Sequence, residues 1–407
     1  MKQTSPSAHR SLRVAVVTET YPPEIGGAAM CVRRFVEALV ARGHLVEVIR
    51  PRQSARDRPG ADDDMPALLT RPLAIGLHPG LQLGRPEGRR LLARWRAERP
   101  DVVHVATEGP LGLSALRAAR RLGLPLSSSF HTNFHSFSRY YGLGALQALG
   151  MAYMRWFHNR AACTMVPTAQ TRDVLHSAGF RGLAVVPRGV DTVLFTPARR
   201  SEELRRAWGA GPGDPVALHV GRLAPEKNVP LAIEAFRALQ REAPRARMVL
   251  VGEGPERGRL ERANPDLVFA GMRRGEDLAS HYASGDLFLF PSLSETFGNV
   301  TLEAMASGLA VVAYDDAAAH EHIRPFETGL LAPPGRADLF LAAAADLVRD
   351  PQLMRRLRQG AVKAAAEIGW DAVGRAFEGL VCRIAAGGGL ETAGRPSPMG
   401  AAAGARA

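Results

Sequence analysis

Residues 286–308 read DLFLFPSLSETFGNVTLEAMASG, and this stretch sets the architecture of the second half of the chain. The apolar run 287–290 predicts a buried strand, which a Ser/Glu/Thr/Gly turn connects to a helix. Glu295 falls in the turn and Glu303 in the helix, with seven residues between them. The start of such a helix attracts a diphosphate, and flanking carboxylates accept hydrogen bonds from hydroxyls. The stretch therefore predicts a site for a sugar joined to a nucleotide.

Two glutamates at this spacing also fit solvated surface charges around a helix start. The neighbouring residues separate the two interpretations. Phe297, Gly298 and Asn299 lie in the turn, and residues 304–308 are small. This context favours a binding site.

Strands and helices alternate along the rest of the chain. We expect strands at residues 12–17, 44–50, 102–106, 126–130, 216–220, 247–251, 267–270, 287–290 and 310–314, and helices at 28–42, 87–98, 111–122, 229–241, 256–263 and 277–283. Alternation of this kind builds right-handed βαβ units on a parallel sheet. The sequence thus predicts an α/β protein of two doubly wound, Rossmann-like domains, with ligand held where the carboxyl ends of the strands face the interdomain cleft.

A length of 407 residues suits two domains. We expect the chain to divide into a disordered start (1–10), a first domain (11–193), a second domain (194–370), a helix packing back toward the first domain (371–385) and a disordered tail rich in Gly, Ala and Pro (386–407).

The composition, 46% hydrophobic and 23% charged, is typical of a soluble globular protein. The chain has no run of about 18 apolar residues and no long apolar segment near its start, so we expect neither a membrane span nor a secretory signal. A cytoplasmic location follows from this expectation. The three cysteines are too few and too scattered to suggest disulfides or a metal site.

The net charge of +12 belongs entirely to the first half. Residues 1–193 hold 26 Lys and Arg against 14 Asp and Glu, while residues 194–407 hold 26 of each. A basic half can face nucleic acid, an anionic membrane or an acidic substrate. No nucleic-acid-binding motif accompanies it, so nucleic acid is not an expected partner. Because Arg is the habitual cation of this chain, a compositional bias explains the excess equally well.

Gly26 and Gly27 lie in the loop between the first strand and the first helix, behind Pro22 and Pro23. Glycines in this place let a phosphate or a sugar approach the backbone without meeting a Cβ atom. A tight turn with no ligand is the alternative reading.

Arg222 and Lys227 occur in HVGRLAPEKNVP, directly after a predicted strand and before a helix. Two cations on such a loop can converge on one diphosphate, or they can simply be solvated loop charges. Lys227 favours the first interpretation because this chain has only three lysines, and a compact ammonium reaches a phosphate where a planar guanidinium does not fit.

Gly252 and Glu253 lie one strand later, in LVGEGPERGRL. The segment only superficially matches the dinucleotide fingerprint, because Pro255 and a displaced third glycine break the pattern. A turn near the base or ribose of a donor and an ordinary structural turn remain equally open.

His131 ends a predicted strand in SSSFHTNFHSFSRYYG, so it should point toward the interdomain cleft. A histidine there can hydrogen-bond a transferred sugar, although an ordinary polar loop residue fits as well. His135, Arg139 and Tyr140 follow at spacings that could line an acceptor site for a sugar or a lipid headgroup.

Two helices are candidates for contact with an anionic membrane. Residues 144–161 are apolar with basic residues toward the end, and residues 87–98 are strongly basic. The apolar helix can equally bury its face in its own domain.

Together these segments resemble the retaining nucleotide-sugar glycosyltransferases of the GT-B fold, the glycosyl transferases group 1. The similarity extends from about residue 12 to residue 370 and is strongest over 216–335. The segments SFHTNF and RYYG are most similar to lipid mannosyltransferases and sulfoquinovosyl diacylglycerol synthases. The resemblance implies an acceptor-side first domain and a donor-binding second domain.

The resemblance also implies roles for individual residues. The donor diphosphate would be held by Arg222, Lys227 and the backbone N–H groups of Phe297, Gly298 and Asn299, the ribose by Glu303, and the hydroxyls of the transferred sugar by Glu295, while Gly26, Gly27 and His131 would come from the first domain. In that family a front-face substitution is generally proposed, in which the leaving diphosphate helps to deprotonate the acceptor. We therefore expect a hexosyltransferase that needs neither a cofactor nor a metal ion.

The expected partners are a nucleotide-sugar donor, with GDP-mannose as first choice and a uridine donor next, and a lipid or lipid-linked glycan as acceptor. Peripheral contact with the inner face of the membrane is a further expectation. The alternatives are a nucleotide-sugar epimerase or hydrolase of the same fold and a nucleotide-sugar-binding protein without activity. A glycan phosphorylase is less compatible, because neither Lys227 nor Lys363 lies in a pyridoxal phosphate context.

Overall fold

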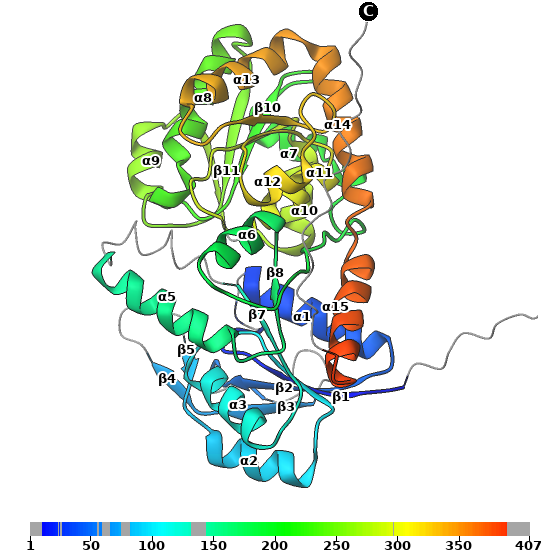
Figure 1. The fold of residues 1–407 in the computed structure, drawn as a ribbon. Helices are drawn as coiled ribbons and strands as arrows, with labels where there is room; N and C mark the ends of the chain where they lie inside the picture. The colour runs from blue at the N-terminus through cyan, green and yellow to red at the C-terminus, as the bar shows by residue number, and fades with distance from the viewer. Residues whose placement is uncertain are drawn as a thin grey trace, which may run out of the picture.

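The computed structural model of the protein describes residues 10–22, 24, 27–54, 57–58, 66–74, 82–131, 144–295 and 297–388. These residues form two domains. In Figure 1 the N-terminal domain lies at the bottom and the C-terminal domain at the top. Each domain is built on its own parallel sheet. In the described part of the chain, no helix combines the length and the apolar character needed to cross a bilayer.

The N-terminal domain contains, among the described residues, a seven-stranded parallel sheet in the order β3-β2-β1-β6-β7-β8-β9. Its strands are β1 (Arg13–Val17), β2 (Leu45–Pro51), β3 (Ala67–Thr70), β6 (Val102–Val105), β7 (Leu126–Ser129), β8 (Cys163–Val166) and β9 (Leu183–Val185). A separate antiparallel pair is formed by β4 (Pro72–Ala74) and β5 (Gln82–Gly84). The helices of this domain are α1 (Gly27–Ala41), α2 (Gly88–Ala97), α3 (Pro110–Arg121), α5 (Gly144–His158) and α6 (Ala169–Ser177).

The C-terminal domain contains, in its described residues, a six-stranded parallel sheet in the order β12-β11-β10-β13-β14-β15. Its strands are β10 (Val216–Val220), β11 (Arg247–Val251), β12 (Val268–Gly271), β13 (Leu287–Phe290), β14 (Ala310–Tyr314) and β15 (Leu330–Ala332). Its helices are α7 (Glu202–Ala207), α8 (Val229–Glu242), α9 (Arg257–Ala263), α10 (Gly275–Ser284), α11 (Asn299–Ala306), α12 (Ala317–His322), α13 (Ala337–Arg349) and α14 (Pro351–Ala366).

Both sheets are covered on their two faces, which explains why the central strands β6, β10 and β13 are buried at every position. In β1, Val14 and Val16 join a core with α1, whereas Ala15 and Val17 join a second core with α2 and α3. In the C-terminal domain, α8 and α13 cover one face of the sheet, and α10 and α11 cover the other. Alternate residues of one strand therefore build two different cores.

The last helix, α15 (Trp370–Ala385), returns from the C-terminal domain to the N-terminal one (Figure 1). The ring of Phe377 stacks on Phe35 of α1, with centroids 4.3 Å apart and an interplanar angle of 4°. The chain thus passes between the domains twice, and the two passages touch where Val190 N–H donates to the carbonyl of Ile368 over 3.0 Å. The N-terminal core is completed only by the end of the chain.

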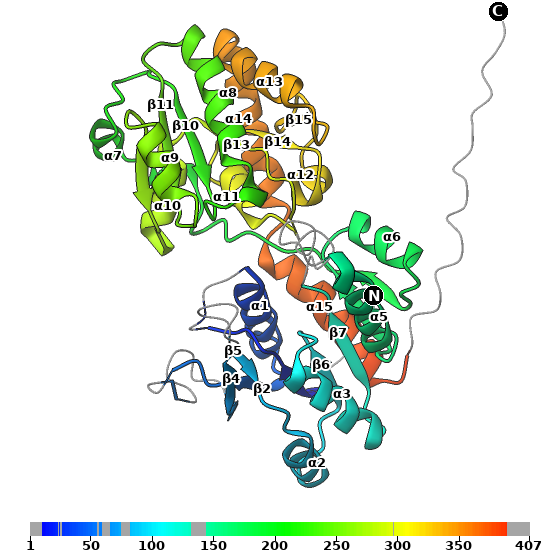
Figure 2. The ribbon, with the colours of Figure 1, turned by 90° about the vertical axis from the view of Figure 1, so that its left-hand side faces the viewer.

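In each sheet the strand order reverses at the strand that comes first in the sequence, which is β1 in the N-terminal sheet and β10 in the C-terminal one. In the N-terminal sheet, β2 and β6 lie on opposite sides of β1, and in the C-terminal sheet β11 and β13 lie on opposite sides of β10. The loops that leave the carboxyl ends of strands at such a reversal diverge, which is where doubly wound domains bind ligands. Figure 2 shows α1, which follows β1, at the side of the N-terminal domain that faces the C-terminal domain.

Candidate active site

The first residues of two helices, one from each domain, meet between the domains. Gly27 begins α1 and Asn299 begins α11. A Cβ atom built on Gly27 would lie 3.4 Å from Asn299 Nδ2 and 3.5 Å from Nη1 of Arg188. The positive ends of two helix dipoles and a guanidinium thus converge, and this arrangement attracts an anion.

The turn before α11 is shaped by its glycine and anchored by its aromatic ring. Gly298 has a φ of 89°, a conformation that glycine adopts without strain. Phe297 is buried, and its carbonyl accepts a hydrogen bond of 2.7 Å from Ala318 N–H. No side chain of the described residues caps the helix, and among its first N–H groups that of Thr301 donates to the carbonyl of Gly298 over 3.0 Å. The N–H groups of Asn299 and Val300 precede it and are the ones a ligand can use.

Lys227 and Glu295 form an ion pair at the mouth of this turn. Lys227 lies in a short 3₁₀ segment after β10, and its Nζ atom is 5.8 Å from the ring centroid of Phe290. The two residues come from loops 68 positions apart in the chain. The C-terminal domain thus brings a cation and a carboxylate to one point, where they neutralise each other in the ligand-free protein.

Arg222, the other predicted cation, is exposed at the carboxyl end of β10. Its side chain makes no hydrogen bond or ion pair with a described residue. It therefore remains available for a ligand from the solvent side.

Glu303 lies in α11, where the hydroxyl of Tyr282 donates a hydrogen bond of 2.9 Å to its Oε2 atom. Burial raises the pKa of Glu303 to about 7, and the hydrogen bond from Tyr282 partly opposes this shift. A carboxyl group with this pKa is poised to change its protonation state when hydroxyls of a ligand approach.

The Gly252 loop is explained first by packing. A Cβ atom on Gly252 would lie 1.9 Å from the carbonyl oxygen of Gly221, so a side chain there would clash with the loop after β10. Glu253 forms an ion pair with Arg257 of α9. Packing and this ion pair are sufficient to explain why Gly252 and Glu253 occur in the turn. A role for these two residues at the donor base stays a prediction.

His131 lies two residues after the end of β7 and contacts Arg188. Nη2 of Arg188 lies 3.4 Å from Nδ1 of His131, and Nε2 of His131 is buried without a partner among the described residues. Burial and the positive charge of Arg188 hold the pKa of His131 well below its ordinary value. The ring is therefore neutral, with Nδ1 accepting from Arg188 and an N–H at Nε2 left to donate.

Arg188 itself was not identified from the sequence. It follows β9 by three residues, is only 5% exposed, and its guanidinium lies 5.6 Å from the ring centroid of Phe297 in the other domain. The signal that selected His131, a polar residue just past the end of a parallel strand, applies equally to Arg188. The last strands of the first domain, β8 and β9, were not predicted, so the signal was missed.

Four predicted residues lie outside the described part of the chain. They are Gly26, His135, Arg139 and Tyr140. The structure therefore brings together His131, Gly27, Asn299, Phe297, Gly298, Lys227 and Glu295, together with Arg188.

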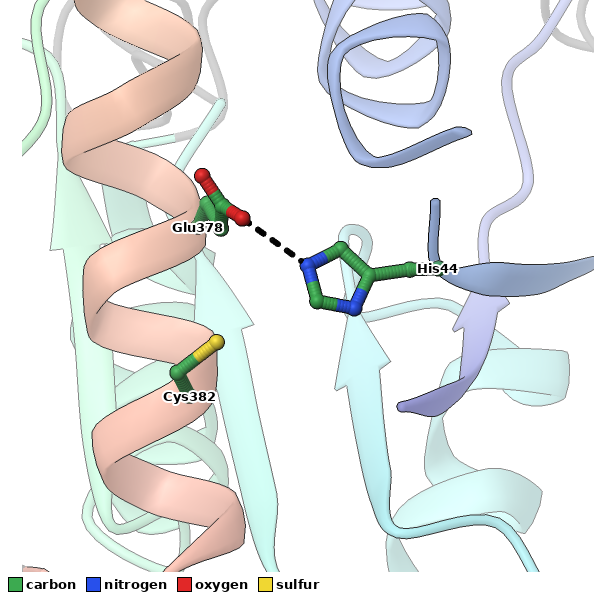
Figure 3. A group of neighbouring side chains, drawn as sticks. All are labelled: His44, Glu378 and Cys382. Atoms are coloured by element: carbon green, nitrogen blue, oxygen red, sulfur yellow. Dashed lines mark hydrogen bonds and ion pairs between the residues drawn. The ribbon is translucent and has the colours of Figure 1, made fainter. Parts of the chain in front are cut away.

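Among the described residues, one group brings three potential metal ligands together, formed by His44, Glu378 and Cys382 (Figure 3). Nδ1 of His44 accepts a hydrogen bond of 3.1 Å from Leu12 N–H, so Nε2 must carry the proton that it donates to Glu378 over 3.0 Å. Burial raises the pKa of the Cys382 thiol. With the imidazole lone pair already used, this group anchors α15 to the N-terminal domain and does not fit a metal ion.

Comparison with protein-family models divides the chain as the two domains do. Residues 25–194 match the model "Glycosyltransferase Family 4" and residues 200–364 match "Glycosyl transferases group 1". A GDP-mannose-dependent alpha-mannosyltransferase of Mycobacterium tuberculosis is 36% identical over 357 residues, which is 84% of this chain and 89% of the relative. A GDP-mannose-dependent alpha-(1-6)-phosphatidylinositol dimannoside mannosyltransferase of the same species is 30% identical over 85% of this chain and 90% of its own.

Among solved structures, a sucrose-phosphate synthase from Thermosynechococcus elongatus superposes with a TM-score of 0.77. The match covers 93% of this chain and all of the other, at 21% sequence identity. The predicted fold, two doubly wound domains in the GT-B arrangement, is therefore confirmed.

Proposed function

Because this chain belongs to the group 1 glycosyltransferases and is therefore a glycosyltransferase, we propose that it transfers mannose from GDP-mannose to a hydroxyl of a lipid or lipid-linked glycan, with retention at the anomeric carbon. The choice of donor is supported by the relatives named above, both of which depend on GDP-mannose. The choice of acceptor is supported by the second of them, which acts on a phosphatidylinositol dimannoside.

The observation that carries the proposal is the meeting of two helix N-termini and a lysine around one point between the domains. Transfer breaks the bond between C1 of the sugar and the β-phosphate oxygen, and the electron pair stays on that oxygen. Lys227 and the N–H groups of α11 stabilise the growing negative charge. The acceptor oxygen forms the new bond to C1 on the same face, and its proton passes to the leaving phosphate.

Glu295 and His131 take positioning roles in this proposal. Glu295 accepts hydrogen bonds from sugar hydroxyls, and the N–H at Nε2 of His131 donates one. No carboxylate is needed as a covalent nucleophile, unlike the paired acids of retaining glycosidases. Because cations and a helix N-terminus stabilise the diphosphate, we propose that the reaction needs no metal ion.

Product analysis tests the function. The protein is incubated with GDP-mannose or UDP-glucose, with and without a lipid acceptor extract, and released nucleotide and mannosylated product are measured. We expect release that depends on both GDP-mannose and the acceptor, and an α-linkage by NMR. Release without an acceptor would instead identify a hydrolase, binding without release would identify a sensor, and release with UDP-glucose alone would reassign the donor.

The lipid acceptor implies contact with a membrane surface, and α5 is the proposed contact. It exposes Leu149 (70%), together with Tyr153 and Trp156, and Arg160 stacks on Trp156 with its guanidinium 4.0 Å from the ring centroid. Exposed apolar rings beside cations suit the interface of an anionic bilayer. The proposed location is therefore the inner face of the cytoplasmic membrane.

Sedimentation with anionic vesicles tests this contact. We expect binding at low salt that weakens at high salt, because surface charges are screened. Leu149→Glu should abolish it, while Val174→Glu, at a position on α6 that is 56% exposed, should leave it intact. Equal binding by both variants would remove α5 from the proposal.

A further inference from the structure

We propose that Arg188, from the acceptor-side domain, is a third cationic ligand of the donor diphosphate and binds its β-phosphate. The inference rests on the proposed function and adds a residue of the first domain to the diphosphate site. In this proposal both domains contribute cations that neutralise the charge of the leaving group.

The first argument is that Arg188 is a buried charge without a counter-charge. Its side chain is 5% exposed, and no carboxylate of the described residues forms an ion pair with it. The segment 132–143, which follows His131, contains no Asp or Glu. A guanidinium removed from water without an anionic partner is strongly unfavourable, so an arrangement of this kind is expected where a ligand supplies the anion.

The second argument is the direction of its N–H groups. Nη2 is directed at His131, Nη1 approaches the space above Gly27, and Nε is buried without a partner among the described residues. Of the five N–H groups of a guanidinium, the structure accounts for one with a hydrogen bond of 3.4 Å. The others have no hydrogen-bond partner among the described residues, so they can form the paired hydrogen bonds that phosphate oxygens accept.

The third argument is that Arg188 is held against the donor-side domain. Its guanidinium lies 5.6 Å from the ring centroid of Phe297, in the turn that begins α11. The carbonyl of the same residue is bonded to Ala318, so the ring is fixed in the C-terminal domain. The cation therefore sits at the start of α11, where the β-phosphate is proposed to lie.

The chemical consequence follows from the proposed transfer. When the bond between C1 and the β-phosphate oxygen breaks, the electron pair stays on that oxygen, and Arg188 neutralises part of its charge. Because Arg188 also donates to Nδ1 of His131, the same side chain keeps the N–H at Nε2 directed at the sugar. Arg188 thus connects leaving-group stabilisation with sugar positioning.

An anionic group on the acceptor is the competing ligand for the same guanidinium. The two possibilities predict different dependences. If Arg188 binds the donor, its contribution to affinity requires the β-phosphate, whereas if it binds the acceptor, the contribution does not depend on the donor. Comparing GDP with GMP separates them, since GMP lacks the β-phosphate.

The experiment measures binding of GDP and GMP by calorimetry, and kcat and KM for transfer, in the native protein, Arg188→Gln and Arg188→Lys. Arg172→Gln is the matched control, since Arg172 is an exposed arginine of the same domain whose guanidinium forms an ion pair with its neighbour Asp173. We expect Arg188→Gln to weaken GDP binding at least about tenfold and to leave GMP binding within about twofold, with kcat falling about 100-fold. Arg188→Lys should recover part of both losses.

Thermal unfolding of the ligand-free variants separates this role from a structural one. Removing an unpaired buried cation should leave the Tm of Arg188→Gln unchanged or higher, whereas a structural cation would lower it. Equal losses of GDP and GMP affinity, a loss confined to the KM of the acceptor, or a lowered Tm with normal GDP binding would each overturn the proposal.

The same measurements distinguish a failure of the proposed role of Arg188 from a failure of the proposed mannose transfer. If the native protein transfers no sugar but Arg188→Gln loses GDP and not GMP affinity, the diphosphate contact stands and the transfer proposal falls. If the native protein transfers mannose and the variant binds GDP normally, only the role of Arg188 is wrong.

Discussion

Lys227 and Arg188 come from opposite domains, and they differ in whether a carboxylate of the described residues pairs with them. Lys227 of the donor-side domain forms an ion pair with Glu295 in the ligand-free protein. Arg188 of the acceptor-side domain is buried more deeply, yet no described carboxylate pairs with it. Lys227 and its partner therefore balance each other's charge, whereas the charge of Arg188 is one that a ligand can balance.

The difference assigns different tasks to the two domains. If the diphosphate binds as proposed, it has to compete with Glu295 for Lys227. At Arg188 it would displace no carboxylate of the described residues, and its arrival would relieve an unfavourable buried charge.

The largest effect is expected from Lys227→Ala. Removing a cation that faces the leaving group should lower kcat about 100-fold. Lys363→Ala is the control, because Lys363 is an exposed lysine of α14 away from the site. Steady-state kinetics measure the effect, and normal turnover in Lys227→Ala would show that its ion pair with Glu295 serves only the fold.

Glu295→Ala should leave Lys227 without its paired carboxylate, as Arg188 is in the native protein among the described residues. We expect kcat to fall at least about tenfold as contacts to the sugar are lost, while GDP, which carries no sugar, binds more tightly. Calorimetry and kinetics measure the two quantities separately. Weaker GDP binding would contradict the idea that Glu295 competes with the diphosphate.

The pH dependence of donor binding should come from Glu303. Its pKa of about 7 lies above the ordinary value of 4.5, so the carboxyl gains a proton in the ligand-free site as the pH falls through 7. Ribose hydroxyls favour the ionised form, so GDP affinity should fall about tenfold between pH 8 and pH 6. His131, whose pKa is depressed, does not titrate in this range.

Calorimetry in buffers of different ionisation enthalpy measures the proton released on binding. Glu303→Gln should flatten the profile, and an unchanged slope in that variant would assign the titration to another group. The same raised pKa means that Glu303 stabilises the ligand-free fold fully below pH 4.5 and that this contribution is lost as the pH rises through 7.

The smallest effect is expected from Gly27→Ala, which narrows the space between Arg188 and the side chain of Asn299. The added Cβ atom meets Asn299 and Arg188 at ordinary contact distances, so the Tm should not fall. The KM for the donor should rise about fivefold, or about 1 kcal/mol, because a phosphate loses that space. Gly88→Ala, at the open first position of α2, is the control; equal KM values in both variants would place the diphosphate elsewhere.

Most of the fold could be predicted from the sequence, because it depends on local patterns. The expected strands at residues 216–220, 247–251, 287–290 and 310–314 agree with β10, β11, β13 and β14 at both ends. Apart from His219 in β10 and Arg247 at the start of β11, these strands are apolar runs bounded by turn residues, which is the clearest signal of a buried parallel strand. Short elements with mixed composition were missed, among them β3, the β4–β5 pair, β8 and β9.

Part of the candidate site could be predicted for the same reason. Glu295, Gly298 and Asn299 belong to one turn, and Lys227 follows a recognisable strand, so short stretches of sequence reveal them. Arg188 and His131 are 57 residues apart, and only the pairing of β7 with β8 and of β8 with β9 brings their strand ends together. Nothing in the segment VVPRGVD indicates that its arginine is buried.

The sequence by itself determined the alternating strands and helices, the two-domain division and the residue types placed at each strand end, because these depend on periodicity and turn chemistry over a few residues. Only the tertiary structure decided which charges are neutralised. Pairing Lys227 with Glu295, leaving Arg188 without a described carboxylate and raising the pKa of Glu303 all depend on burial and on neighbours distant in the chain. Solvent exclusion and the distances between charges, which exist only after folding, set these energies.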